Sequence, residues 1–318
     1  MSGKELERVN PLEREDLLRE RAIKTFKKSP HLDSRAEHYL GDVPKPTRWF
    51  TIRELLDIRS RLEPDVPEVI RCGNKSLKNW TIRGASPIWN PKVFTMVFHK
   101  DGLYKGKETE HCLVITNREF KTIYKAVNCY LYVPNPHLTF IRLMQILYAD
   151  IPPCPIRHGK TPPRLGSWNS FGGQGFGFAR TEEGKLLRFP HIGGIIIGEG
   201  VEIGSNVCID RGALGDTVIG VGTKIDNHVH IAHNVIVGKH CHIVAHTTIG
   251  GSTEIGDYCW IGMGAQIRNK VKIGTNVTIG MGAIVVSDVK DNAIVAGNPA
   301  KVIGKNVTWS DGRKQSVS

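Results

Sequence analysis

Histidines in the second half of the chain are the residues whose type and spacing first suggest chemistry. His228 and His246 are 18 residues apart, and the same interval separates His233 from Gly251. A neutral imidazole, with an ordinary pKa of about 6.5, can take a proton from an attacking nucleophile. A glycine beside it can offer an uncovered backbone N–H to a developing oxyanion. Histidines on one face can also bind zinc, so the spacing leaves both chemistries open.

A second set of polar residues follows the same interval, since Asn234, Ser252 and Lys270 are also 18 apart. A lysine at such a position can bind a phosphate or a 4′-phosphopantetheine group, or support an oxyanion as a cation. It can equally be a solvated surface charge. Asn234 can orient the neighbouring His233 or bind sugar hydroxyls. We therefore treat Asn234 and Lys270 as candidate substrate-binding residues.

A repeat of six residues must position these side chains. β-Branched residues occupy every sixth position from 219 onward, namely Ile219, Ile225, Ile231, Val237, Ile243, Ile249, Ile255, Ile261, Ile267, Ile273, Ile279 and Val285. The same spacing appears earlier at Ile197, Ile203 and Ile209, after which the phase slips by four residues. Period six fits neither an amphipathic helix nor a simple meander, and it predicts a parallel β-helix with three hexads per coil of 18 residues. Residues 18 apart should then stack on adjacent coils, about 4.8 Å from one another.

Four segments in this half are more specific than the hexads, namely Gly175-Phe176-Gly177-Phe178-Ala179, Ile209-Asp210-Arg211-Gly212-Ala213-Leu214, Asp226-Asn227 and Ile231-Ala232-His233-Asn234-Val235. In this order and spacing they resemble the UDP-3-O-acylglucosamine N-acyltransferase family of the lipid A pathway. The resemblance is close over residues 172–285. It implies a mainly β fold, with a left-handed parallel β-helix and a small N-terminal α/β domain. It also implies a homotrimer with sites in the clefts between neighbours, and transfer of an acyl chain to a glucosamine amine.

The resemblance further implies roles for individual residues. His233 occupies the position of the family's general base, and Gly251 that of its backbone oxyanion donor. Lys270 stands where the family has a second histidine. Asp210 and Arg211 flank the four-residue slip, and we expect them to order it or to contact substrate.

A zinc hydratase of the γ-class carbonic anhydrase type is the alternative from another reaction class. His228 and His233 have the separation of two of its ligands, but the third would be His191, which the slip moves out of phase. Zinc needs three converging ligands, so we predict no metal. We expect these histidines to lie at a trimer interface or to line the substrate site instead, and we treat His246 as a candidate substrate-binding residue. A non-catalytic binder of sugar nucleotides is a further alternative.

The first half of the chain resembles the small uridine-binding domain of the same family. The matching segments are Ile82-Arg83-Gly84-Ala85-Ser86-Pro87-Ile88 and Val133-Pro134-Asn135-Pro136-His137-Leu138-Thr139-Phe140. Phe98 and Tyr104 stand where that domain has two aromatic residues that clamp the uracil. A flat base gains about 1–3 kcal/mol from stacking on such rings. Two aromatic residues in the core of a small α/β domain are the alternative.

The C-terminal residues leave two classes of acyl donor open. Gly297-Asn298-Pro299-Ala300-Lys301 is typical of coenzyme-A-dependent sugar acetyltransferases, whereas the enzymes that use an acyl carrier protein continue into C-terminal helices. An acetyl-CoA-dependent sugar acetyltransferase is therefore the alternative enzyme. In both cases the donor, acyl carrier protein or coenzyme A thioester, is a cosubstrate, and no tightly bound cofactor is expected.

Composition limits the partners and the compartment. The 43 Lys and Arg exceed the 31 Asp and Glu, which gives a net charge of +12 and favours an anionic partner. No nucleic-acid-binding motif accompanies this charge, so we expect a UDP-amino-sugar and an acyl donor rather than nucleic acid. No run of about 18 apolar residues is present to span a bilayer. The seven cysteines show no paired framework, which favours a reducing compartment and hence the cytoplasm.

These observations predict five segments along the chain. Residues 1–58 form a charged, partly helical extension, and 59–150 form the α/β uridine-nucleotide-binding-like domain. Residues 151–171 are a Pro-rich linker, 172–304 are the β-helix acyltransferase domain, and 305–318 are a flexible tail.

Overall fold

The computed structural model describes residues 50–63, 69–72, 81–82, 84–85, 95–99, 112–117, 128–151, 153–310 and 313–315. Most of the predicted extension over 1–58 therefore lies outside the described residues, and so does Tyr104. The chain divides into two compact units, Met1–Leu143 and Met144–Ser318.

The first unit is built on a five-stranded sheet. Its strands lie in the order β2 (Val69–Cys72), β7 (Cys129–Tyr132), β6 (Leu113–Thr116), β5 (Thr95–His99) and β4 (Gly84–Ala85). β2 is antiparallel to β7, and the remaining neighbours are parallel. A separate antiparallel pair joins β1 (Phe50–Thr51) to β3 (Thr81–Ile82). Cys129 is disulfide-bonded, a feature that the cysteine spacing did not indicate.

Two helices accompany this sheet, and each begins at a cap that the sequence encodes. α3 (Ile52–Leu62) starts at a capping box, in which Thr51 Oγ1 accepts from the Glu54 N–H and the Glu54 carboxylate accepts from the Thr51 N–H. α4 (Pro136–Leu147) starts at Asn135, whose Oδ1 accepts from the Leu138 N–H at 3.2 Å. Proline then takes the first helical position, where no N–H is needed. The Asn-Pro motif of the sequence is thus a helix start.

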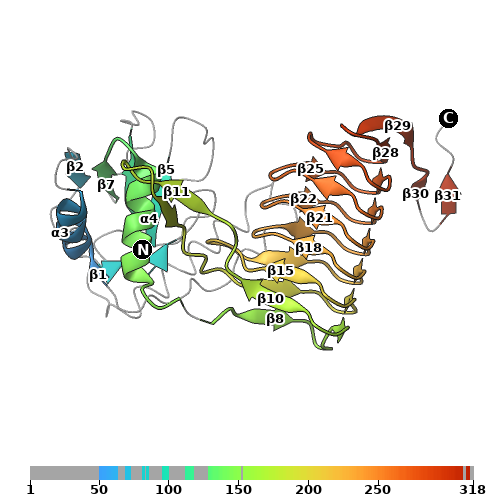
Figure 1. Ribbon diagram of the computed structural model, residues 1–318, viewed down its shortest axis with the longest axis horizontal. Coiled ribbons are helices and arrows are strands. Elements are labelled where there is room, and N and C mark those ends of the chain that lie inside the picture. Colours follow the sequence, from blue (N-terminus) through green and yellow to red (C-terminus); the bar gives the residue numbers. More distant parts are fainter. Residues whose placement is uncertain are drawn as a thin grey trace, which may run out of the picture. The chain divides into compact units, whose positions relative to one another are not determined.

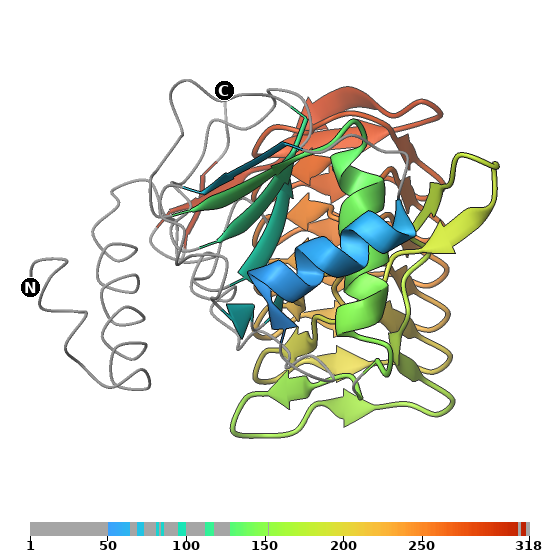
Figure 2. The ribbon, with the colours of Figure 1, turned by 90° about the vertical axis from the view of Figure 1, so that its left-hand side faces the viewer.

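The two helices cross in the view of Figure 2. A buried carboxylate connects them. Glu63, just after α3, lies 3.1 Å from Arg59 Nε and 2.6 Å from Arg142 Nη1, and it accepts from the Thr139 hydroxyl. Because Glu63 is 5 % exposed, the pairing compensates for the removal of its charge from water.

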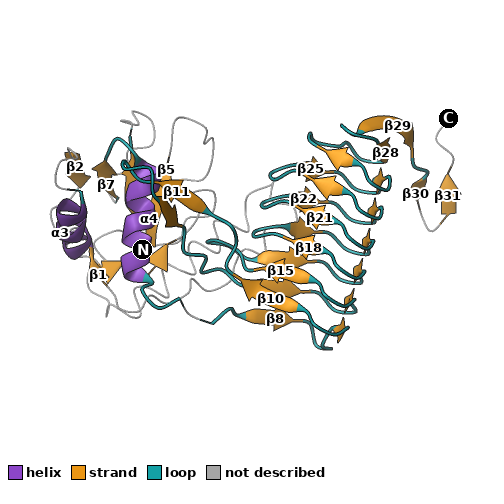
Figure 3. Cartoon of the chain, in the orientation of Figure 1, coloured by secondary structure: helices purple, strands orange, loops and turns teal. Residues whose placement is uncertain are grey.

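The second unit contains the parallel β-helix that the six-residue repeat predicts (Figures 1 and 3). Face one comprises β8 (Ile156–His158), β13 (Ile195–Ile197), β16 (Thr217–Ile219), β19 (Ile236–Val237), β22 (Glu254–Ile255) and β25 (Lys272–Ile273). Face two comprises β9 (Arg164–Leu165), β14 (Glu202–Ile203), β17 (Lys224–Ile225), β20 (His242–Ile243), β23 (Trp260–Ile261), β26 (Thr278–Ile279), β28 (Ala293–Ala296) and β29 (Lys301–Lys305). Face three comprises β10 (Ser170–Gly173), β15 (Cys208–Asp210), β18 (His230–Ile231), β21 (Thr248–Ile249), β24 (Gln266–Ile267) and β27 (Ile284–Val285).

The residues of the repeat form the core of this β-helix. On face three, Ile209 is in register with Ile231, Ile231 with Ile249, and Ile249 with Ile267. All four side chains are at most 3 % exposed. Burial of each contributes about 1.5–3 kcal/mol, and its β-branched shape suits the short strand. The predicted stacking of residues 18 apart is therefore present.

The predicted linker over 151–171 is wrong, because β8, β9 and the start of β10 form a first coil. Ile156 pairs with Ile195, Leu165 with Ile203 and Phe171 with Ile209, all in parallel register. The inward position of β8 is His158, and it precedes Leu165 by seven residues. Because one inward residue of this coil is polar and the interval to the next is seven residues, the six-residue periodicity did not indicate this coil. At the end of the β-helix its inward residues have neighbours on one side only, and Leu165 remains 52 % exposed.

The far end of the β-helix is closed by a strand that reverses direction. β29 pairs antiparallel with β28, and the segment Gly297–Ala300 lies between them. Within the predicted flexible tail, β30 (Thr308–Ser310) pairs antiparallel with β31 (Arg313–Gln315). Over the described parts of the chain, no helix has the length and apolar character needed to cross a membrane.

Candidate active site

The irregular segments of the β-helix gather at one of its three edges. Each coil passes from face three to face one through residues 174–194, 211–216, 232–235, 250–253 or 268–271, and we call this edge the His233 corner. The first of these segments carries the hairpin of β11 (Phe178–Arg180) and β12 (Leu186–Arg188). The second contains the four-residue slip. Departures from the repeat therefore coincide with the residues that could do chemistry.

His233 and Gly251 are neighbours at this corner. A Cβ placed on Gly251 would lie 2.6 Å from His233 Nε2, so only a glycine leaves room for the imidazole. The backbone joins the same two coils, since Ser252 N donates to the His233 carbonyl at 2.9 Å. The adjacency predicted from the interval of 18 is present in the structure.

Asn234 determines which nitrogen of His233 carries the proton. Its Oδ1 accepts from Ala213 N at 2.9 Å and its Nδ2 donates to the Gly215 carbonyl at 3.1 Å, which fixes the orientation of the amide. The same Oδ1 lies 3.1 Å from His233 Nδ1, so Nδ1 must be the donor. A neutral imidazole then has its lone pair on Nε2, the atom beside Gly251. Asn234 thereby connects the slip segment to the imidazole and orients it.

The N–H of Gly251 is available to a ligand. Among the described residues, no hydrogen bond uses this N–H, although the Gly251 carbonyl accepts from Lys270 N at 2.9 Å. A proton acceptor and a hydrogen-bond donor are thus side by side, which is the pairing that acyl transfer requires.

Asp210 and Arg211 lie one coil below His233 and differ in exposure. Asp210 Oδ2 is 3.9 Å from His230 Nε2, and burial raises the pKa of the Asp210 carboxyl, while His230 and His233 act in the opposite direction. The Arg211 guanidinium is buried, and it donates to the carbonyls of Gly193 at 2.8 Å and Ile192 at 3.1 Å. Arg211 therefore holds the segment before β13.

Lys270 lies two coils above Asn234, in the column that the interval of 18 predicts. Asn234, Ser252 and Lys270 share a left-handed backbone, with φ of 58°, 59° and 63°. The Lys270 side chain is exposed at the His233 corner.

His246 is not part of the His233 corner. It lies between faces two and three, where its ring stacks on His228 with centroids 4.9 Å apart and planes within 7°. His246 follows His233 by 13 residues, which is two hexads and one residue. Because three hexads complete one coil, the chain has reached a different corner by His246. Within one chain, His246 and His233 therefore lie at different corners of the β-helix.

His191 also lies at this corner, although the sequence indicated it only as a third zinc ligand out of phase and did not predict its contact with His233. It is 1 % exposed, and its ring meets that of His233 edge to face, with centroids 4.9 Å apart and an interplanar angle of 77°. Burial lowers the pKa of His191 to about 4, and the charges of His233, Arg188 and Arg211 add to this, against the hydrogen bond to the Phe189 carbonyl. The residue precedes the first hexad and follows no period, so only its histidine type could have drawn attention. Within the described parts of the chain, no group of three or more His, Cys, Asp or Glu side chains is arranged to hold a metal.

Phe98 belongs to the first unit, at the end of β5. Its half-buried ring packs against Phe140 of α4 at a centroid distance of 4.7 Å and against His137 at 5.2 Å. One side of the expected uracil clamp is therefore an aromatic cluster held by α4. Its expected partner, Tyr104, lies outside the described residues.

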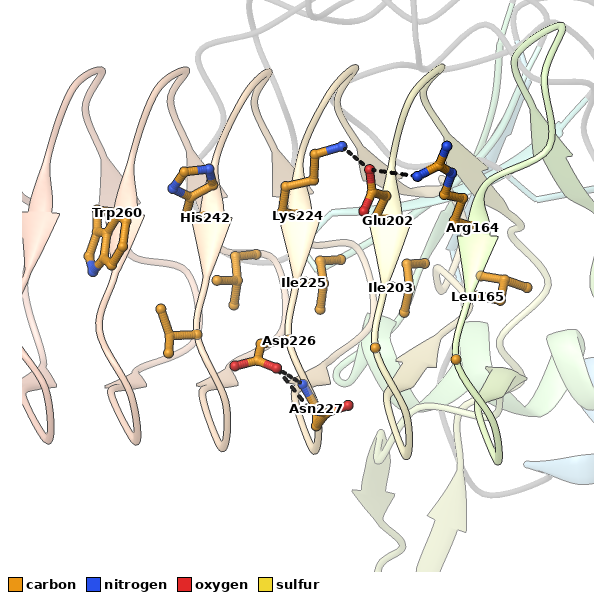
Figure 4. Close-up of a pocket in the computed structure, with 14 residues that line it drawn as sticks. Arg164, Leu165, Glu202, Ile203, Lys224, Ile225, Asp226, Asn227, His242 and Trp260 are labelled. Carbon is orange, nitrogen blue, oxygen red and sulfur yellow. Dashed lines mark hydrogen bonds and ion pairs between the residues drawn. The ribbon is translucent and has the colours of Figure 1, made fainter.

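A groove of about 580 Å³ runs along face two, away from the His233 corner (Figure 4). Arg164, Glu202 and Lys224 line it as a ladder of alternating charge, with Glu202 Oε1 2.7 Å from Lys224 Nζ and 4.0 Å from Arg164 Nη1. His242 and Trp260 continue the row with an edge-to-face ring contact at 5.1 Å. Ion pairs this exposed add little stability, and their side chains remain free to rearrange.

Comparisons with known proteins match the hexad region. Residues 252–287 match the family described as bacterial transferase hexapeptide (six repeats). The chain is 60 % identical over 74 residues to the UDP-3-O-acylglucosamine N-acyltransferase of Methylobacterium nodulans, which covers 23 % of this chain and 21 % of the relative. It is 53 % identical over 81 residues to UDP-3-O-acylglucosamine N-acyltransferase 1 of Francisella tularensis subsp. holarctica, covering 25 % and 23 %. The chain thus matches about a fifth of the length of these curated relatives, and over that part the predicted resemblance is confirmed.

Solved structures with similar coils include a perosamine N-acetyltransferase mutant from Caulobacter crescentus in complex with CoA and GDP-perosamine. It is 29 % identical, with a TM-score of 0.33, and the match covers 35 % of this chain and 51 % of that one. LpxA from Acinetobacter baumannii is 18 % identical, with a TM-score of 0.42 and 70 % of each chain covered.

Proposed function

We propose that this protein is an N-acyltransferase that moves an acyl group from a thioester donor to the amine of a UDP-linked amino sugar. The observation that carries the proposal is the juxtaposition of His233 Nε2 with Gly251, while Asn234 holds Nδ1. The identity of 53–60 % to UDP-3-O-acylglucosamine N-acyltransferases over this region supports the choice of reaction and of acceptor.

The proposed reaction is an addition followed by an elimination. The amine nitrogen of the sugar forms a bond to the thioester carbonyl carbon, and the carbonyl π electrons move to oxygen. His233 Nε2 takes a proton from the nitrogen, and the Gly251 N–H stabilises the oxyanion. When the C=O bond re-forms, the C–S bond breaks, and the thiolate takes the proton from the imidazolium. The products are an amide and a free thiol, and His233 returns to its neutral form.

Binding of the two substrates is part of the same proposal. Phe98 would stack on the uracil, and the net charge of +12 favours the diphosphate of the acceptor and an anionic donor. Lys270 would bind a phosphate of the donor, which is an acyl carrier protein or a coenzyme A thioester. The donor and the acceptor are cosubstrates, and the reaction needs no resident cofactor.

A homotrimer and a cytoplasmic location complete the proposal. In a trimer, the His233 corner of one chain would face the next chain across a cleft. Sedimentation of the full chain tests this, since a trimer of 35.3 kDa chains has three times the monomer mass. The cytoplasm suits the cysteines that lie without a paired framework, and the disulfide at Cys129 is the observation that opposes it.

An acetyl-CoA-dependent sugar acetyltransferase is the second candidate. It is favoured by the segment Gly297–Lys301, which lies between β28 and β29 at the end of the β-helix. The chemistry at His233 would be the same, and only the donor and acceptor would differ.

Product analysis tests both candidates. The purified chain is incubated with UDP-amino-sugars and either acyl-acyl-carrier protein or acetyl-CoA, and the products are weighed by mass spectrometry. We expect an amide product whose formation falls at least about 100-fold in His233→Ala and is unchanged in His240→Ala, an exposed histidine at another corner. Binding of UDP-sugar without any product would leave a non-catalytic binder, and product formation that survives His233→Ala would refute the assigned base.

A further inference from the structure

The His191 imidazole has a buried nitrogen with no hydrogen-bond partner among the described residues. Its Nε2 is covered, and the whole residue is 1 % exposed. Such an acceptor carries a desolvation cost that a phenyl ring of similar size would avoid. A purely structural role would therefore be served better by an apolar residue.

The segment around His191 fixes both its orientation and its tautomer. Nδ1 lies 2.8 Å from the Phe189 carbonyl, so Nδ1 donates and the lone pair is on Nε2. The Gln174 side chain accepts from the His191 N–H at 3.0 Å and donates to its carbonyl at 3.1 Å. Gly175 and Gly177 leave room for the ring, because a Cβ on either would lie within 2.9 Å of an imidazole atom.

His191 Nε2 and the side chain of His233 lie close to the same point beside Gly175. The point where Gly175 would carry a Cβ is 2.6 Å from His191 Nε2 and 3.0 Å from His233 Cβ. The protonated side, at Nδ1, is instead bonded to Phe189. The negative end of the imidazole dipole therefore lies on the side of the His191 ring that is next to the His233 side chain.

We propose that His191 is a positioning residue for His233, which holds the ring edge to face and turns its unpaired Nε2 toward the imidazole that becomes positive during the reaction. This inference rests on the proposed function, in which His233 accepts the proton of the amine. The dipole of His191 favours the imidazolium, and the packing keeps His233 Nε2 beside Gly251.

The charges around the pair fit this role. Asp210 and His230 lie below His233 on face three, Lys270 lies above it, and Arg188 and Arg211 are the cations nearest to His191. A protonated His191 would repel the imidazolium of His233. Burial keeps the pKa of His191 at about 4, so it is neutral at the pH at which His233 works.

Substitution of His191 by phenylalanine and by glutamine separates the dipole from the packing. His191→Phe keeps a ring and removes the lone pair, whereas His191→Gln keeps an acceptor oxygen. In the full chain, we expect His191→Phe to move the midpoint of the pH titration of the His233 ring resonances down by about half a unit, and kcat to fall about threefold with KM little changed. His191→Gln should restore most of that shift. His240→Phe, at an exposed corner, is the matched control.

Two results would overturn the inference. One is a His233 titration and a pH–rate profile that are the same in His191→Phe and wild type. The other is an equal loss of kcat in His191→Phe and His191→Gln with no change in the His233 titration, which would mean packing alone. If His191→Phe is poorly folded, His191→Leu, which also removes the lone pair, is compared with His191→Gln instead. The resonance titration needs no turnover, so inactive wild-type protein would refute the proposed function and leave this test intact.

Discussion

Asn234 Oδ1 lies within hydrogen-bonding distance of both His233 Nδ1, at 3.1 Å, and Ala213 N, at 2.9 Å. One amide oxygen therefore serves the candidate base and the slip segment of the preceding coil. The slip and the imidazole are parts of one arrangement, because neither bond can form unless the amide has this orientation.

Removal of the Asn234 side chain should impair catalysis more than stability. In Asn234→Ala, His233 Nδ1 loses its acceptor, the ring is free to adopt the other tautomer, and we expect kcat to fall about 10- to 100-fold. Steady-state kinetics of acyl transfer measure this. Asn276→Ala is the control, because Asn276 has the same left-handed backbone, with φ of 56°, at a different corner. Equal activity of the two variants would contradict the role assigned to Asn234.

A methyl group on Gly251 should displace the imidazole. The Cβ of Gly251→Ala would lie 2.6 Å from His233 Nε2, so the His233 side chain must move away from the oxyanion donor. We expect kcat to fall about 100-fold or more, with a melting temperature close to that of wild type, because the end of a side chain yields more easily than backbone. Gly304→Ala is the control, since its Cβ would meet only ordinary contacts at 3.6 Å. An unaltered rate in Gly251→Ala would show that the space beside His233 is not used.

The buried His191 should make the protein sensitive to acid. Its pKa in the folded state is about 4, below the ordinary value of 6.5, so the unfolded chain binds a proton more readily. The stability that follows from this difference is fully present above about pH 6.5 and is lost as the pH falls toward about 4. Between pH 7 and pH 4.5 the free energy of unfolding of the wild type should fall by about 2–3 kcal/mol more than that of His191→Gln. Urea unfolding at the two pH values measures the difference, and parallel losses would argue that His191 titrates normally.

The buried carboxylate of Glu63 should contribute more to the free energy of unfolding of the first unit than the exposed ion pair of Asp57 and Arg61 does. Glu63→Ala leaves the buried Arg59 without this partner and removes the contact to Arg142, so we expect the first unit to lose about 3–5 kcal/mol. Asp57→Ala, which breaks the exposed pair with Arg61 at 2.7 Å, should cost at most about 0.5 kcal/mol. Hydrogen exchange resolved along the chain measures both. A loss that appears equally in the β-helix would contradict the assignment of this network to the first unit.

The six-residue period of the sequence was sufficient to predict the β-helix and the neighbourhood of His233 and Gly251. Each β-branched residue of the repeat fills one inward position of a short strand, so the residues of the core can be identified from the local sequence pattern. From Ile231 to Ile267, stacking then follows from arithmetic, because each residue of the repeat pairs with the residue 18 positions later. The fold class and the adjacency of His233 and Gly251 needed nothing beyond this periodicity and the resemblance of a few motifs.

Tertiary structure alone decided what lies outside the period. The first coil has His158 at an inward position and an interval of seven before Leu165, so only the ladder with β13 and β14 reveals it. His191 is brought against His233 by an insertion whose course depends on the contacts of Gln174 and Phe189. In a repeating core, each coil stacks on the one before it, so its position follows from the repeat. An insertion is instead positioned by the distant groups that form hydrogen bonds with its polar atoms. The local sequence pattern does not indicate which groups these are.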